Sequence, residues 1–224
     1  MRVKPGDRYP NDYTVEELKD ISESLEAAVT VPVNVQVEAE HRVYDLSEMK
    51  AILLKAGRIV LQECGCRRDH GNCDHPLETC LTVNGAAEES LKNNRYSPRE
   101  VDLHQAIEAL ERSHRAGLVH MAYTMKGDDS PTVICSCCPC SCHTLGGLIR
   151  YGIHTQVLTS RYVAEDDESK CVQCGACVDR CSFLARSMVD GELVYDESKC
   201  FGCGLCVSTC PASAISLVER RGAA

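Results

Sequence analysis

The residues best suited to chemistry in this sequence are its 17 cysteines. Eight of them form two runs with the same spacing, Cys171-x2-Cys174-x2-Cys177-x3-Cys181 and Cys200-x2-Cys203-x2-Cys206-x3-Cys210. The pentapeptide DESKC opens each run. Four thiolates can also hold zinc, but this triple step is typical of [4Fe-4S] clusters and not of zinc ribbons. The doubled pattern therefore predicts two iron–sulfur clusters.

The spacing also predicts which thiol serves which cluster. Three cysteines on a tight loop can each reach one iron, and in this motif the fourth cysteine of each run binds the other cluster. The predicted ligand sets are Cys171, Cys174, Cys177 and Cys210 for cluster 1, and Cys200, Cys203, Cys206 and Cys181 for cluster 2. Because this exchange ties the two halves together, we expect folding of this region to depend on metal binding.

Residues 166 to about 218 resemble the bacterial-type two-[4Fe-4S] ferredoxin family in these runs and in Gly175, Gly202 and Gly204. The segment RSMVDGELVYD adds a hairpin signal at Asp190-Gly191. One position departs from the repeat, because Ser182 stands where the second run has Pro211, but no ligand is lost. The resemblance implies a ferredoxin-like dicluster domain with a pseudo-twofold internal repeat that moves single electrons at low potential. The clusters add negative charge, so a redox partner with a basic docking surface is expected.

Nine further cysteines lie upstream, in two sequence groups: Cys64, Cys66, Cys73 and Cys80, then Cys135, Cys137, Cys138, Cys140 and Cys142. They are candidate ligands of at least one additional Fe-S cluster. A four-thiolate zinc site in the first group is an alternative. Another alternative is a redox-active thiol pair at the adjacent Cys137 and Cys138, and inert buried cysteines are the simplest one.

Other side chains near these cysteines are weaker candidates. His70, His75 and His143 could bind metal, although a surface or supporting role is the more common one. A cation such as Arg67 or Arg68 beside Cys66 would favour a thiolate. Residues 60 to 218 loosely resemble cysteine-rich ferredoxin-like proteins of anaerobes, in which C-x-C-R and CC-x-C segments precede a dicluster domain. This resemblance favours the additional cluster.

Alternating helix and strand signals around these cysteines predict an α+β fold. Helices are expected at 15–28, with a capping box of Thr14 and Glu17, and at 46–56, with Asp45 and Glu48 at its start and Gly57 after its end. Another helix is expected from Ser97 to Gly117, and a short one after Cys142. Strands are expected from near Pro32 to Val37 and at 59–61, 119–123 and 132–134. The segment AEDDESK is expected to link a cysteine-rich α+β domain at 1–160 to the ferredoxin domain at 161–224.

Composition and charge exclude several classes of function. The net charge of −9 disfavours a nucleic-acid binder. The N-terminus has no apolar signal region and no segment is long enough to span a membrane, so a cytoplasmic protein is expected, in which cysteines are not disulfide-bonded. No Gly-rich phosphate loop or nucleophile elbow is present.

Three functions remain open. The favoured one is low-potential electron transfer through two [4Fe-4S] clusters and a further Fe-S centre, serving a partner oxidoreductase. The second is a redox enzyme in which the ferredoxin domain feeds an open-site cluster or a reactive cysteine pair. The third is a zinc-stabilised interaction module fused to a ferredoxin. An electron carrier or oxidoreductase subunit is favoured over an independent enzyme, and the oligomeric state is left open.

Overall fold

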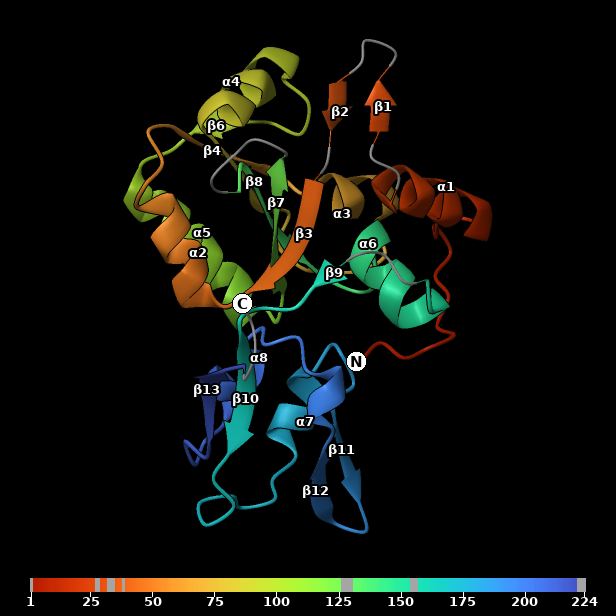
Figure 1. The fold of residues 1–224 in the computed structure, drawn as a ribbon, viewed down its shortest axis with the longest axis vertical. Coiled ribbons are helices and arrows are strands. Elements are labelled where there is room, and N and C mark those ends of the chain that lie inside the picture. The colour runs from red at the N-terminus through yellow and green to blue at the C-terminus, as the bar shows by residue number, and fades with distance from the viewer. Residues whose placement is uncertain are drawn as a thin grey trace.

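The computed structural model describes residues 2–26, 29–31, 35–37, 39–125, 131–153 and 157–220. Its centre is a seven-stranded sheet (Figure 1). The strands follow the order β6 (Arg99–Glu100), β4 (Ile59–Glu63), β5 (Glu78–Val83), β8 (Val133–Cys137), β7 (Val119–Met125), β3 (Ala39–Tyr44) and β9 (Val157–Leu158). All neighbours are antiparallel except β3 and β9. Mixed helix and strand content is thus confirmed, as are the strands predicted at 59–61, 119–123 and 132–134.

Helices α2 (Leu46–Leu53) and α5 (Leu103–Arg115) pack against one face of this sheet (Figure 1). Met49 and Leu110 from these helices meet Leu81 and Ile134 from the strands, and all four side chains are buried. The capping box of Asp45 and Glu48 starts α2 as predicted, but the helix ends at Leu53, before the expected 56.

The helix predicted from Ser97 is wrong at its start. Arg99 and Glu100 pair with β4 instead, and α5 begins at Leu103, where Asp102 and Gln105 form the capping box. Pairing of backbone with a neighbouring strand, which is not visible in the local sequence, overrides the helix-start signal. The predicted end is correct, because Gly117 follows the helix with a φ of +85°.

The opposite face of the sheet is covered by α6 (His143–Gly146) and the π-helical turn η1 (Gly147–Tyr151). Together they form the helix predicted after Cys142. Leu145 and Ile149 pack there on Val43 and Met121. Helix α3 (Gly65–His70) follows β4, and α4 (Asn84–Asn93) follows β5; neither was predicted. The sheet thus has an ordinary apolar core on one face and, as shown below, thiols on the other.

The N-terminal elements only partly follow their sequence signals. Helix α1 (Val15–Glu26) begins at the predicted box, where the Thr14 amide donates to Glu17 and the Glu17 amide to Thr14. The strand predicted from near Pro32 to Val37 is confirmed at β2 (Val35–Val37), which pairs antiparallel with β1 (Val29–Val31). Residues 28 and 32–34 lie outside the described residues.

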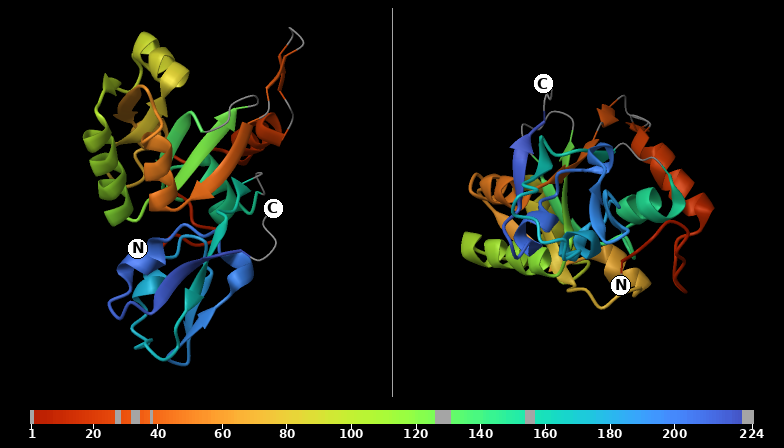
Figure 2. Two further views of the ribbon diagram at one scale, coloured as in Figure 1. Left: turned by 60° about the vertical axis from the view of Figure 1, so that its left-hand side comes forward. Right: turned by 90° about the horizontal axis from the view of Figure 1, so that it is seen from below.

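The C-terminal part lies against one end of the sheet region (Figures 1 and 2). It contains the antiparallel pairs β10 (Tyr162–Asp166) with β13 (Ile215–Glu219) and β11 (Arg186–Val189) with β12 (Glu192–Tyr195). Helices α7 (Ala176–Arg180) and α8 (Leu205–Thr209) and the 3-10 turn η2 (Glu197–Lys199) complete it. The predicted hairpin turn is confirmed by positive φ angles of 51° at Asp190 and 86° at Gly191. The predicted linker is wrong for residues 164–166, which belong to β10.

Polar contacts join this part to the sheet region. The Arg180 side chain donates to the His114 and Arg115 carbonyls, and His114 Nε2 lies 2.8 Å from the Ser208 hydroxyl. The two parts are therefore closely packed, and the proposed boundary at 160/161 stays a prediction. Among the described helices, none is long and apolar enough to cross a bilayer.

Candidate metal centres

Two cavities in the C-terminal part are each lined by four cysteines. Cys171, Cys174, Cys177 and Cys210 line the first cavity. Cys181, Cys200, Cys203 and Cys206 line the second. Each cavity thus collects three thiols from one run and the last thiol of the other run. Four thiols around a void are the donor set that a [4Fe-4S] cube needs, so the residues fit this group.

The two DESKC repeats build these cavities with the same local conformation. Gly175 and Gly204 precede α7 and α8 with φ angles of 74° and 73°, a region that glycine enters without strain. Asp167 and Asp196 accept hydrogen bonds from the serine two residues on, both amide and hydroxyl. This repetition is local, and a pseudo-twofold relation between the halves stays a prediction.

Arg186 lies between the two sets of thiols. Its side chain is 1% exposed and donates two hydrogen bonds of 2.6 Å to the Asp166 carboxylate. Burial raises the pKa of Cys206 to about 11, and the positive charge of Arg186 acts in the opposite direction. Burial also raises the pKa of the Cys177 thiol, and the same guanidinium acts to lower it. One buried cation therefore offsets negative charge at both cavities.

The upstream cysteines form two groups that differ from their grouping in the sequence. The larger one, the six-thiol group, consists of Cys64, Cys66, Cys80, Cys135, Cys137 and Cys142. Strand alternation explains it in part, because Cys135 and Cys137 face away from Ile134 and its apolar core. Cys80 joins them because β5 pairs with β8 at Leu81 and Ile134, one residue away.

Mutual contact shifts the acidity of these thiols in opposite directions. Contact with Cys142 is the main cause that raises the pKa of Cys66 to about 12. Contacts with Cys137 and Cys66 lower the pKa of Cys142 to about 5. His143 Nδ1 lies 3.5 Å from the Cys66 sulfur. The group thus holds six sulfur donors and one imidazole on the sheet face opposite α2 and α5.

The smaller group, the three-thiol group, consists of Cys73, Cys138 and Cys140. The Cys73 and Cys138 sulfurs are 3.6 Å apart. The ligand atoms of Cys73, His75 and Cys140 lie within 4.8 Å of one another. The adjacent residues Cys137 and Cys138 therefore contact different groups. Cys73 is likewise separated from the other three cysteines with which it had been grouped as a zinc site.

The two arginines predicted to lie beside thiols, Arg67 and Arg68, have different surroundings. Arg67 is 2% exposed, and its Nη1 lies 3.9 Å from the Cys138 sulfur. It also donates to the Pro76 and Ser136 carbonyls at 3.0 and 2.9 Å. Arg68 is exposed and lies 3.6 Å from the Glu63 carboxylate. Of these two arginines, only Arg67 is placed to stabilise a thiolate.

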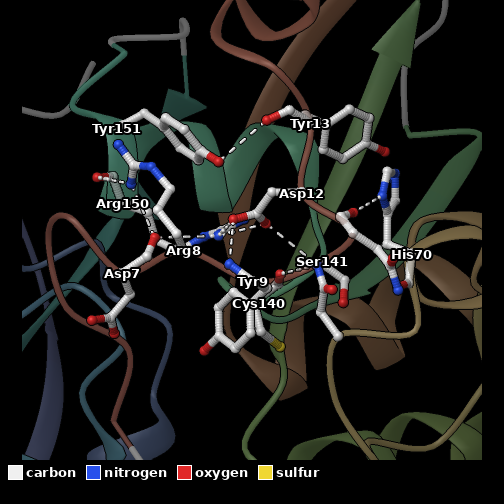
Figure 3. A network of polar contacts seen from close by, with 12 residues as sticks. Asp7, Arg8, Tyr9, Asp12, Tyr13, His70, Cys140, Ser141, Arg150 and Tyr151 are labelled. Atoms are coloured by element: carbon white, nitrogen blue, oxygen red, sulfur yellow. Dashed lines mark hydrogen bonds and ion pairs between the residues drawn. The ribbon is translucent and has the colours of Figure 1, made fainter.

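The N-terminal segment lies over both groups, a position that the sequence did not predict. The Arg150 side chain pairs with the Asp12 carboxylate at 2.6 and 2.7 Å (Figure 3); Arg150 is buried and the Asp12 side chain is only partly exposed. Tyr9 packs on the three-thiol group. Tyr13 packs on His70 with ring centroids 3.9 Å apart. Burial is the main cause that raises the pKa of Tyr13, and contact with Cys66 raises it further.

Apolar side chains connect the six-thiol group to the second cavity. Cys137 and Cys142 share a buried cluster with Phe183 and Leu205. Phe183 stacks on Phe201 at 4.3 Å, and both rings line the second cavity. The second cavity is therefore the nearer of the two to the upstream thiols along this cluster.

Comparison with known proteins bears on the C-terminal part. A family model described as a 4Fe-4S binding domain matches residues 164–187 and again residues 193–216. A search among curated proteins gives no match. The two matched stretches contain all eight cysteines of the two cavities. The C-terminal part of the chain is therefore a 4Fe-4S binding domain made of two repeats, which supports iron–sulfur electron transfer in general.

Proposed function

We propose that this protein transfers low-potential electrons between a partner oxidoreductase and a further Fe-S centre held by the six-thiol group, through two [4Fe-4S] clusters. The single observation that carries the proposal is the pair of four-cysteine cavities inside the matched 4Fe-4S domain. Cys171, Cys174, Cys177 and Cys210 would bind cluster 1. Cys181, Cys200, Cys203 and Cys206 would bind cluster 2. Bound clusters would accept and release single electrons.

The arrangement of the cavities favours an order of transfer. Cys174 of the first cavity is exposed, so cluster 1 is accessible to a partner protein. The second cavity is connected to the six-thiol group through Phe183 and Leu205. Electrons would therefore pass from the partner to cluster 1, then cluster 2, then the upstream centre, or in reverse. A partner with a basic docking surface would suit the acidic chain, and its rate of electron transfer would fall as ionic strength rises.

The alternative of a redox enzyme rests on the size of the upstream group. A cube uses four thiolates, whereas six are gathered here and His143 lies 3.5 Å from one of them. Two thiols would then remain for substrate or for an open coordination position. A spectroscopic signal of the upstream centre that shifts when cyanide binds would favour this alternative over simple transfer.

Iron analysis of the anaerobically purified full-length chain tests the proposal. We expect about twelve irons per chain, four for each of three clusters. Cys135→Ser should reduce the upstream signal, and Cys174→Ser, the matched control, should reduce only a signal of the ferredoxin region. A wild-type content of about eight irons would contradict the upstream centre. A content near zero, after purification without air, would overturn the whole proposal.

A further inference from the structure

We propose that Cys73, His75, Cys138 and Cys140 bind a single zinc ion, at a site separate from the six-thiol group. The site goes beyond the proposed electron transfer and needs no redox change of its metal. Three thiolates and one imidazole form the Cys3His donor set that zinc takes in closed, four-coordinate structural sites. Zinc is favoured because sulfur and imidazole donors together suit it better than calcium or magnesium.

The distances fit one shared ion. Two thiolates bound to one tetrahedral zinc at about 2.3 Å lie about 3.8 Å apart. The Cys73 and Cys138 sulfurs are 3.6 Å apart. The Cys73 and Cys140 sulfurs and a His75 ring nitrogen all lie within 4.8 Å of one another. Cys138 and Cys140 also lie in one buried cluster, and Cys73 packs against it. Cys138 is not within 4.8 Å of all three, so a shift of its side chain or of His75 would be needed to complete the tetrahedron.

Two short loops supply the donors in pairs. Cys73 and His75 flank one residue of the first loop, and Cys138 and Cys140 flank Pro139 in the second. Arg67 joins the loops, because it donates to the carbonyl of Pro76, next to His75, and to that of Ser136, near Cys138. Asn72 adds a 3.1 Å hydrogen bond to the Cys140 carbonyl. The chain thus holds the two pairs of donors face to face through its own side chains.

The charge at this position also balances. Zinc with three thiolates and a neutral imidazole carries one negative charge, and buried charge is tolerated when it is paired. The Arg67 guanidinium, 3.9 Å from the Cys138 sulfur and itself buried, supplies the compensating positive charge. In the absence of an ion, the same guanidinium would stabilise only one thiolate of the group.

The surroundings keep this site apart from the six-thiol group. Cys138 and Cys140 pack with Leu118, whereas Cys137 and Cys142 pack with Leu145 in a different cluster. A groove lined by these thiols and His75 gives access to the site, and Arg180 and Cys181 also line it. This groove provides an entry path for the ion. It also places the site beside Cys181, one of the thiols of the second cavity.

Zinc and iron analysis of the anaerobically purified full-length protein tests the site. Wild type should hold about one zinc per chain. Cys140→Ser should lose this zinc and keep the iron content of wild type. His70→Ala, in which a nearby histidine outside the site is removed, should keep both metals. The proposal is overturned if wild type holds no zinc, if Cys140→Ser keeps it, or if Cys140→Ser loses about four irons, because its thiol would then serve a cluster.

Zinc-edge X-ray absorption of the wild-type protein provides a second test, which does not depend on whether a variant folds. We expect a first shell of three sulfurs at about 2.3 Å and one nitrogen at about 2.0–2.1 Å. Four sulfurs or several oxygens would refute the Cys3His assignment. The iron content shows whether the zinc site or the proposed upstream cluster has failed. About eight irons with one zinc would leave the zinc site standing without an upstream cluster, and about twelve irons without zinc would do the reverse.

Discussion

The buried ion pair between Arg150 and Asp12 holds the N-terminal segment over the thiol groups, and its removal allows a quantitative test. The Arg150 side chain is 2% exposed and that of Asp12 is 10% exposed. The same carboxylate accepts a 2.7 Å hydrogen bond from the Tyr9 amide. In Arg150→Met the carboxylate would stay buried without its cation. Breaking a buried pair in this way costs roughly 3–5 kcal/mol.

This cost should appear as local opening of the segment. Since each 1.4 kcal/mol is a factor of ten, the opening equilibrium should rise roughly a hundredfold to a few thousandfold. Native-state hydrogen exchange of the Tyr9 amide measures this change as lost protection. Arg95→Met is the matched control, because Arg95 pairs with Asp69 at the surface, where such pairs contribute about 0–1 kcal/mol. Its effect on Tyr9 should be close to none.

Two results would refute this reasoning. Tyr9 protection within threefold of wild type in Arg150→Met would mean that the ion pair does not hold the segment. An equal loss of protection at Ala164 in β10 would mean that the variant destabilises the whole chain and not the segment alone.

Three further outcomes are expected. Gly202→Ala should prevent normal packing of the second cysteine loop and lower the iron content of the chain. At this position, with a φ of +72°, the new Cβ would lie 2.1 Å from the Tyr162 carbonyl oxygen. The control Gly191→Ala, at a φ of +86° but with no atom within 4 Å, should keep the iron and lower the stability by about 1 kcal/mol. The free energy of unfolding, measured by chemical denaturation, should fall by about 2 kcal/mol as the pH is lowered from 6.5 to 5. Burial lowers the pKa of His120 to about 3, so in this range the unfolded chain binds a proton that the folded chain excludes. His120→Asn should abolish this part of the pH dependence, and an unchanged dependence of stability on pH in the variant would contradict the explanation. Removal of iron with a chelator should abolish the protection of β11 and β12 amides against hydrogen exchange, since we expect folding of this part to depend on metal binding. Retained protection would show that the hairpin folds without metal.

Several features could be predicted from the sequence because their causes are local. The capping box of Thr14 and Glu17 starts α1, and Asp190-Gly191 turns the hairpin, since each depends on residues within one turn. The helix predicted from Ser97 failed for the opposite reason. Pairing of residues 99–100 with β4 depends on a strand about forty positions away, which no local signal at Ser97 reports.

The sequence by itself determined the two cysteine runs and their cluster chemistry, because each run supplies three donors from one short loop. Only the tertiary structure decided how the nine upstream cysteines divide. Pairing of β5 with β8 brings Cys80 to Cys135, and the end of β8 sends Cys137 and Cys138 to different groups. Distance along the chain says little about distance in space once antiparallel strands pair. The sequence grouping of four and five cysteines therefore became six and three in space.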